Sequence, residues 1–181
     1  MSLTELAHKL ISNHASQHQK NLAVDATCGN GYDTEFLAKL GYTQVIGFDI
    51  QARALSNTKH RLEKAALKNV TLIHQGHQHL TVHIEKTVDC FVFNFGYLPA
   101  ADKSVTTTTT NSIKALHAAE NLIADGGVMS LLCYPGHPNG GEETAAIQNW
   151  LNSLDDHWQI DTHLSEKPNE TTPVLYFLQF K

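Results

Sequence analysis

Hydrophobic positions follow two periods along the chain, one typical of helices and one of short buried strands. Near the N-terminus, apolar residues at helical spacing predict a first helix over residues 3–17. Its apolar face comprises Leu3, Leu6, Ala7, Leu10 and Ile11. Short apolar runs predict strands at 21–26, 44–48, 70–74, 88–94, 128–133, 157–164 and 173–180. Helical spacing returns between them at 34–40, 54–67, 113–123 and 142–154.

The order of these elements predicts the fold class. Strands that alternate with helices form a mostly parallel sheet, because each parallel strand needs a crossover connection to reach the same edge again. We therefore expect a Rossmann-like α/β fold, with a mostly parallel seven-stranded sheet, helices on both faces and a C-terminal antiparallel hairpin. Residues 1–181 should form a single domain, since this length is sufficient for one full core.

The composition narrows the class of protein. Apolar residues make up 41% and charged residues 17%, and no apolar run reaches membrane-spanning length or the pattern of a signal peptide. Cys28, Cys90 and Cys133 lack metal-ligand spacing, which favours free thiols in a reducing cytoplasm. The net charge of −5 gives no overall attraction to nucleic acid, so an RNA partner would require a local basic surface.

A Gly-containing turn follows the strand that ends at Asp25, and a helix starts directly after it. Ligands of parallel sheets bind beyond the carboxyl ends of the strands, so this turn lies at the expected ligand edge. Only Gly29-x-Gly31 of the dinucleotide pattern G-x-G-x-x-G is present. Asp25 would repel a pyrophosphate and attract the ammonium and sulfonium groups of S-adenosyl-L-methionine. Asp49, which ends the second strand, is placed to accept hydrogen bonds from ribose hydroxyls.

The predicted cofactor site continues along the strand ends. Because Asp49 fixes the ribose, the segment 75–77 after the third strand should hold the adenine. The spacing of His74, His77 and His79 would also suit a metal, but the assignment to adenine leaves us expecting no metal. The expected cofactor contacts are Asp25, Cys28, Gly29, Asn30, Gly31, Asp33, Asp49, Ile50, Gln51, Gln75, Gly76, His77 and Asn94.

The segment after the fourth strand suggests an acceptor pocket. Asn94 and Tyr97 have the spacing of the Asn-Pro-Pro-Tyr tetrad of enzymes that methylate amino groups of nucleic acids, with Phe95 and Gly96 in place of the prolines. An Asn side chain can orient an amine along the S–CH3 axis, and an aromatic ring can stack a base. The structural alternative is a strand end capped by Asn over a buried aromatic side chain.

Further side chains complete this predicted pocket. Asp102 or His137 could take a proton from an alkylammonium, and Lys103 could meet a phosphate; a solvated ion pair and a turn-stabilising His are the alternatives. Cys133 could attack a pyrimidine, but its apolar surroundings favour a buried thiol. The expected catalytic residues are Asn94, Tyr97, Asp102 and His137, and the expected substrate contacts are Phe95, Gly96, Lys103, Tyr134, Lys167 and Asn169.

Five segments spread along the chain form a distinctive combination: VDATCGNGYDT, FDIQ, FNFGYLPAADKSVTT, YPGHPNGGEE and KPNETTPVLYFLQF. With these segments, nearly the whole chain resembles the putative rRNA methylase family. This resemblance implies the class I methyltransferase fold, S-adenosyl-L-methionine as cofactor, and methylation of 5-aminomethyl-2-thiouridine at the tRNA wobble position. The family often has Arg before Pro-Asn near the C-terminus, where Lys167 keeps the charge without the bidentate fork.

The residues and the resemblance together predict a cytoplasmic N-methyltransferase that acts by direct in-line displacement, and the resemblance implies the anticodon loop of tRNA as its substrate. Within the same class, the acceptor could be an amine of another RNA or of a small molecule. A noncatalytic nucleotide-binding module on the same sheet is the alternative from a different class, and a nicotinamide oxidoreductase is weaker because the third glycine is absent. The oligomeric state, including a homodimer, stays open.

Overall fold

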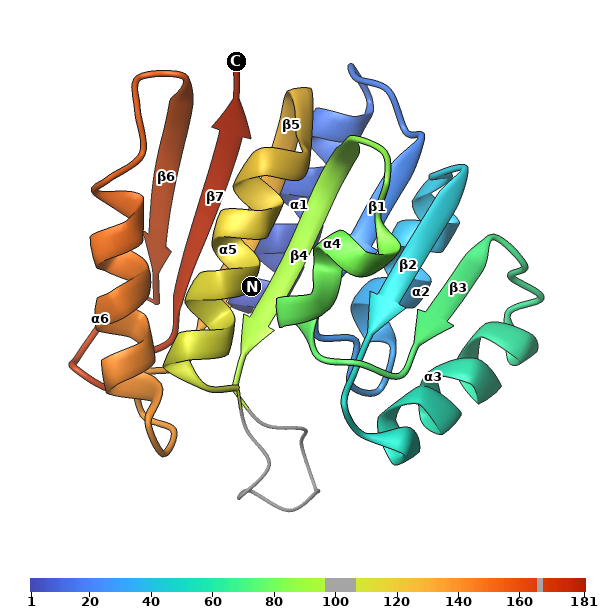
Figure 1. The fold of residues 1–181 in the computed structure, drawn as a ribbon, viewed down its shortest axis with the longest axis horizontal. Helices are drawn as coiled ribbons and strands as arrows, with labels where there is room; N and C mark the ends of the chain where they lie inside the picture. The colour runs from blue at the N-terminus through green and yellow to red at the C-terminus, as the bar shows by residue number, and fades with distance from the viewer. Residues whose placement is uncertain (97–106, 166–167) are drawn as a thin grey trace.

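In the computed structural model, which describes residues 1–96, 107–165 and 168–181, seven strands form one sheet in the order β3-β2-β1-β4-β5-β7-β6 (Figure 1). The strands are β1 (Leu22–Asp25), β2 (Gln44–Phe48), β3 (Val70–Ile73), β4 (Val88–Phe95), β5 (Ile123–Cys133), β6 (Trp158–Leu164) and β7 (Val174–Phe180). The first five pair in parallel, whereas β7 is antiparallel to both β5 and β6. The expected fold class is confirmed.

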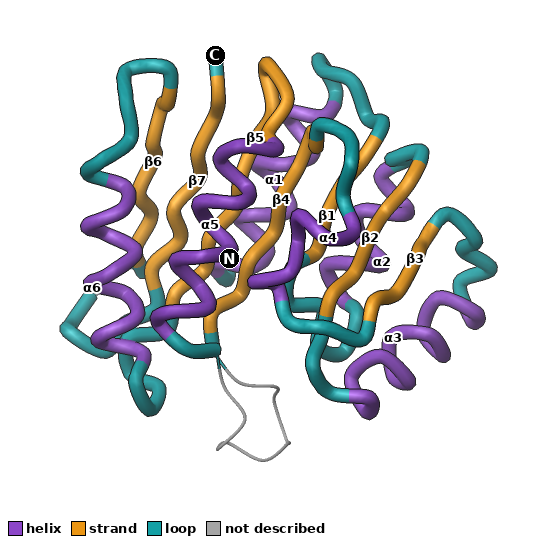
Figure 2. The backbone as a smooth tube through the Cα atoms, in the orientation of Figure 1, coloured by secondary structure: helices purple, strands orange, loops and turns teal. Residues whose placement is uncertain are grey.

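Helices cover both faces of this sheet (Figure 2). One face carries α1 (Leu3–Ala15) and α2 (Tyr32–Leu40), and the other carries α4 (Leu80–His83), α5 (Thr109–Leu122) and α6 (Gly140–Leu151). Next to α2 and β3 lies α3 (Ala52–Lys64). Each face has its own apolar core, centred on the phenylalanines of β4 on one side and on Ile11 and Leu37 on the other. None of the described helices is long and apolar enough to cross a membrane.

Two local features differ from the sequence-based expectation. The stretch Asp125-Gly126-Gly127, expected to end a helix and precede a strand, lies inside β5, which already begins at Ile123. Gly126 takes φ +73° there, and the pairing of β4 with β5 shifts its register between Val88 and Cys90. The short 3-10 helix η1 (His77–His79) and α4 were not predicted, because four residues are too few to show a helical period.

The turn after β1 is fixed by backbone hydrogen bonds to the two neighbouring strands. The Ala26 N–H donates to the Val92 carbonyl of β4, and the Cys28 N–H donates to the Phe48 carbonyl of β2, both over 2.9 Å. The carboxyl ends of β1, β2 and β4 therefore open onto one edge of the sheet, where their following loops meet.

Candidate active site

A cavity of about 890 Å³ lies at this edge, a volume typical of small-molecule sites. Its wall is formed by the loops after β1, β2, β4 and β5, by η1, and by the first residues of α1 and α5. Thirteen of the predicted site residues line it: Cys28, Gly29, Asn30, Asp33, Asp49, Ile50, Gln51, Gly76, His77, Asn94, Gly96, Tyr134 and His137. The structure thus brings together residues from five separate segments.

Other predicted residues are placed elsewhere. Asp25, Gly31, Gln75, Phe95 and Asn169 do not line this cavity, and Tyr97, Asp102, Lys103 and Lys167 lie outside the described residues. Phe95 is 1% exposed and stacks on Phe93 in the core, which differs from the expected substrate contact. Asn169 caps its own turn by accepting from the Thr171 N–H, and the Gln75 side chain is hydrogen-bonded to exposed His83.

Asp25 differs most from its expected role as the partner of a ligand ammonium. Its side chain is fully buried beneath the turn, where it accepts hydrogen bonds from the Thr34 hydroxyl over 2.6 Å and from the Thr27 N–H over 3.3 Å. Burial, together with the nearby Asp33 carboxylate, raises the pKa of Asp25 to about 8. A carboxyl in this position supports the turn from below and does not form part of the cavity wall.

Several lining residues were missed by the sequence-based argument. They are Thr4, Ala26, Thr27, Tyr32, Phe48, Gln78, Thr107, Thr108 and Asn111. Thr27 and Tyr32 stand inside the recognised turn motif, so the motif itself gave a signal for them. Thr4 and Asn111 belong to helices far away in the sequence, and only the packing of α1 and α5 against the sheet brings them to the site.

The glycine turn requires its glycines. Gly29 and Gly31 have φ of +51° and +78°, a region that other residues rarely adopt. A Cβ on Gly31 would lie 2.7 Å from the Thr58 side chain of α3, so the turn packs directly on that helix. The Thr58 hydroxyl also donates to the Gly29 carbonyl over 3.0 Å. The turn is therefore held rigidly between α3 and the strand ends.

Asp49 joins the loops after β1 and β2. One carboxylate oxygen accepts from the Gly29 N–H over 2.9 Å, and the other accepts from the Gln51 N–H over 2.8 Å. Burial raises the pKa of this half-buried carboxyl, and the two backbone hydrogen bonds oppose the rise. Each oxygen keeps a second lone pair, so the group fits the pair of hydroxyls on a ribose.

His77 forms a flat and uncharged part of the cavity wall. It is 7% exposed, and its ring packs edge-on against Phe93 and Phe95 at centroid distances of 6.2 and 6.3 Å. Burial lowers its pKa to about 4, so the imidazole is neutral at pH 7. Its buried Nε2 has no hydrogen-bond partner among the described residues. A flat, uncharged aromatic wall fits a purine such as adenine.

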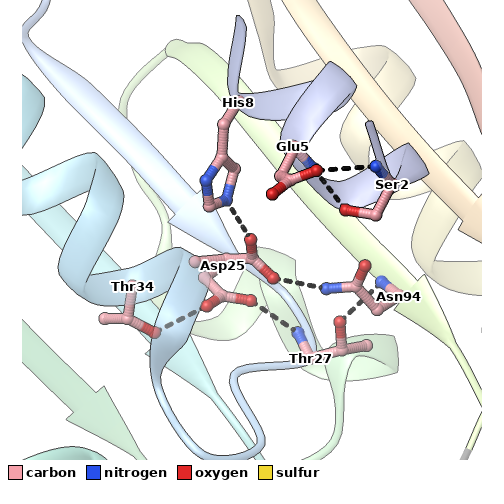
Figure 3. Close-up of polar contacts among 8 residues, drawn as sticks. Ser2, Glu5, His8, Asp25, Thr27, Thr34 and Asn94 are labelled. Carbon is pink, nitrogen blue, oxygen red and sulfur yellow. Dashed lines mark hydrogen bonds and ion pairs between the residues drawn. The ribbon is translucent and has the colours of Figure 1, made fainter.

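A hydrogen-bonded chain of three side chains crosses the cavity wall from α1 to β4 (Figure 3). His8 Nε2 lies 2.5 Å from one oxygen of Asp33, and the Asn94 amide nitrogen donates to the other oxygen over 2.7 Å. His8 is itself held by stacking on Phe36 at 3.8 Å between ring centroids. The Asn94 N–H donates to the Thr27 hydroxyl oxygen over 2.7 Å, so both ends of this residue are fixed.

The opposite wall consists of Tyr134 and His137 from the loop after β5. Their rings are stacked with centroids 4.8 Å apart and planes within 5° of parallel. A Cβ on Gly96 would lie 2.8 Å from His137 Nδ1, so only glycine leaves this pair in place. No group of three or more His, Cys, Asp or Glu side chains within the described ranges is placed to hold a metal ion.

The comparisons with known proteins agree with this geometry. The family described as putative rRNA methylase matches residues 45–179. A chloroplastic tRNA (mnm(5)s(2)U34)-methyltransferase of Arabidopsis thaliana is 32% identical over 189 residues, which cover 97% of this chain and 68% of the relative.

Two solved structures are similar over almost their whole lengths. A putative rRNA-methylase from Clostridium thermocellum has a TM-score of 0.90 and 34% identity, and the match covers 98% of this chain and 97% of that one. SMU.1697c, a putative methyltransferase from Streptococcus mutans solved in complex with SAH, has a TM-score of 0.90 and 31% identity, with 100% and 99% covered.

The fold and the cavity define an S-adenosyl-L-methionine-dependent methyltransferase. The Asp49 carboxylate, the neutral ring of His77 and the rigid glycine turn have the chemistry to hold that cofactor. Within this class, the chain belongs to the putative rRNA methylase family.

Proposed function

We propose that the chain methylates the 5-aminomethyl nitrogen of the wobble (2-thio)uridine in the tRNA anticodon loop, giving 5-methylaminomethyl-2-thiouridine. The name of the Arabidopsis thaliana relative supports this acceptor. The observation that carries the proposal is the contact between Asn94 and Asp33 in the cavity wall. This contact orients the Asn94 amide so that its oxygen can accept a hydrogen bond from an amine.

The amide of Asn94 has a defined orientation. Its nitrogen donates to the Asp33 carboxylate, which can only accept when ionised, so the amide oxygen is the remaining polar atom. No residue of the described ranges donates to that oxygen, which leaves it available for an N–H of the acceptor. Such a bond would hold the nitrogen lone pair along the S–CH3 axis, and positioning is the main requirement of this transfer.

S-adenosyl-L-methionine supplies, when bound, an electrophilic methyl group that an amine lone pair can attack directly. Asp49 would hold its ribose, and Gly76 and His77 would hold its adenine. The turn 28–31 would lie along the rest of the cofactor, and buried Asp25 would support this turn from beneath. With these assignments, the methyl group would point toward Asn94, which lines the same cavity from β4, the strand next to β1.

The acceptor amine must lose a proton before it can attack. An alkylamine is mostly protonated at neutral pH, as a lysine side chain is. Asp33 is bonded to Asn94 and His137 lies against Gly96, so these two lining groups are the described candidates nearest the acceptor side to take this proton. Asp102, outside the described ranges, keeps its predicted role as a further base. Cys133 is buried and does not line the cavity, which agrees with a transfer that needs no covalent attachment to the base.

Nucleoside mass spectrometry of tRNA tests the proposal. Cells without the protein should accumulate the 5-aminomethyl nucleoside, and return of the wild-type chain should restore the methylated nucleoside, whereas Asn94→Ala should not. Purified protein with aminomethyl-bearing tRNA should give the same product. Unchanged wobble nucleosides in both experiments would contradict the proposal and favour an amine of another RNA or of a small molecule.

A further inference from the structure

A second hollow of about 620 Å³ lies beside the active-site cavity, between α2 and α3. The two hollows share Asn30 and Tyr32 in their walls, so they meet at the glycine turn. From that point the second one continues to Lys39 and Lys64 at the C-terminal ends of the two helices. This hollow, lined by Tyr32, Glu35, Lys39, His60, Arg61 and Lys64 among others, is called the basic groove below.

Positive charge is concentrated on this side of the molecule. Residues 52–68 contain five Lys and Arg side chains and one acidic side chain, a net charge of +4, although the whole chain carries −5. Among the described residues that line the basic groove, Glu35 is the one carboxylate, whereas Lys39, Arg61 and Lys64 each carry a positive charge. It is bonded to both Lys39, over 2.6 Å, and Arg61, over 2.9 Å, so an excess of positive charge remains after it is paired.

An aromatic platform stands where the groove meets the cavity. Arg61 donates to the Asn30 carbonyl and to Glu35, each over 2.9 Å, and its guanidinium lies 3.7 Å above the centre of the Tyr32 ring. Arg61 is thus held in one orientation, and it fixes the ring beneath it. Tyr32 is nevertheless 62% exposed, an unusual amount for a large aromatic side chain.

We propose that the basic groove binds the ribose–phosphate backbone of the RNA beside the nucleotide that enters the active site, and that Tyr32 stacks a neighbouring base. This inference rests on the proposed function and names the surface that holds its substrate. Lys and Arg side chains attract phosphates, and exposed aromatic rings stack unpaired bases, which is the usual combination for single-stranded RNA. An anticodon loop offers both groups within a few nucleotides.

Paired substitutions of equal charge test this surface. Lys39→Gln with Lys64→Gln removes two charges from the groove, and Lys86→Gln with Lys114→Gln removes two exposed charges that line neither hollow. Binding of purified tRNA is measured by fluorescence anisotropy over a range of salt concentrations. The groove pair should weaken binding about tenfold and reduce the salt slope by about two, whereas the control pair should bind within about twofold of wild type.

Further measurements separate this inference from the proposed function. Affinity for S-adenosyl-L-methionine should be unchanged in both lysine pairs, and Tyr32→Leu should weaken RNA binding without changing the salt slope. Equal loss of affinity in both lysine pairs, or normal binding by the groove pair, would overturn the groove assignment even if wobble methylation is intact. If tRNA binding depends on the groove but no methylated wobble nucleoside forms, the groove assignment would be supported and the proposed function would be overturned.

Discussion

The side chains of Asn94 and Asp33 meet over 2.7 Å although 61 residues separate them in the sequence. Asn94 comes from the end of β4, and Asp33 comes from the first turn of α2. Their contact connects the proposed acceptor side of the cavity with the turn proposed to face the cofactor. Under the proposed function, this one hydrogen bond would therefore link the orientation of the amine to the placement of the methyl group.

Asn94→Ala should lower turnover far more than it lowers affinity for S-adenosyl-L-methionine. The substitution removes the amide that aligns the amine, and misalignment of this kind costs about 10²-fold in rate. The proposed cofactor wall around Asp49 and His77 stays intact. Steady-state kinetics on aminomethyl-bearing tRNA, together with calorimetric titration of the cofactor, measure the two effects separately.

Asn121→Ala is the matched control for this variant, because Asn121 is an exposed residue of α5 whose amide donates to the His117 carbonyl. It should leave turnover near the wild-type value. Near-normal turnover of Asn94→Ala would show that the acceptor amine is aligned by another part of the cavity.

His8→Ala should also reduce turnover, by a smaller factor than Asn94→Ala. His8 does not line the cavity and reaches it only through Asp33, whose position it helps to fix. The expected change is in kcat, with little change in the KM for tRNA, and His8→Gln should recover part of the loss because its amide can still donate to Asp33. Loss in KM alone would contradict a positioning role.

Asp49→Ala should weaken binding of S-adenosyl-L-methionine by about 1.5–3 kcal/mol, the range for hydrogen bonds to a charged partner. The substitution removes the proposed acceptor for the ribose and also leaves the Gly29 and Gln51 N–H groups without their acceptor, so both effects act in the same direction. Asp156→Ala, at an exposed site, provides the control for loss of one carboxylate. Unchanged affinity in calorimetry of Asp49→Ala would remove the ribose assignment.

Cys133→Ala should keep full methyl transfer. The thiol is fully buried in β5, and burial raises its pKa, so little thiolate exists at neutral pH. The loss of a packed sulfur should lower the unfolding free energy by about 1 kcal/mol, near the average for a point substitution. A denaturation series and a search for trapped protein–RNA adducts check both statements; an inactive folded variant would indicate covalent catalysis.

Asp25 should make stability depend on pH. The folded protein holds this proton up to about pH 8, whereas an unfolded chain releases it near 3.8. The folded state therefore binds more protons in between, and the unfolding free energy falls as pH rises through this window. Asp25→Asn removes the titration, so its stability relative to wild type should rise from about pH 4 to about pH 8 in urea denaturation. A constant difference would contradict a buried protonated carboxyl.

The sequence predicted those elements whose apolar residues recur regularly or whose ends are marked by turn-forming or polar residues. Residues 44–48 match β2 at both ends, because Gly41 and Asp49 bound a run of apolar residues. The start of β5 was not visible, because Asp125-Gly126-Gly127 has the composition of a turn and is held in the sheet by pairing with β4. Such pairing depends on tertiary contacts, which the local pattern of apolar and polar residues does not reveal.

The site was predicted as a set of strand ends, and the direction of each side chain was not predictable. Asp25 and Asp33 are both acids near the turn, yet one is buried beneath it and the other lines the cavity. The difference depends on which face of a strand or helix meets the core, and a shift of one residue reverses it. The contribution of α1 through Thr4 and His8 required the packing of the whole chain.

The position of β7 has a consequence for folding during synthesis. It is the last strand in the chain, but it lies between β5 and β6 and pairs with both. Until residues 174–180 have left the ribosome, the apolar edge of β5 has no neighbour on that side, and such an open edge is a template for association with other chains. Chaperone contact during this interval would protect the nascent sheet until its last strand is inserted.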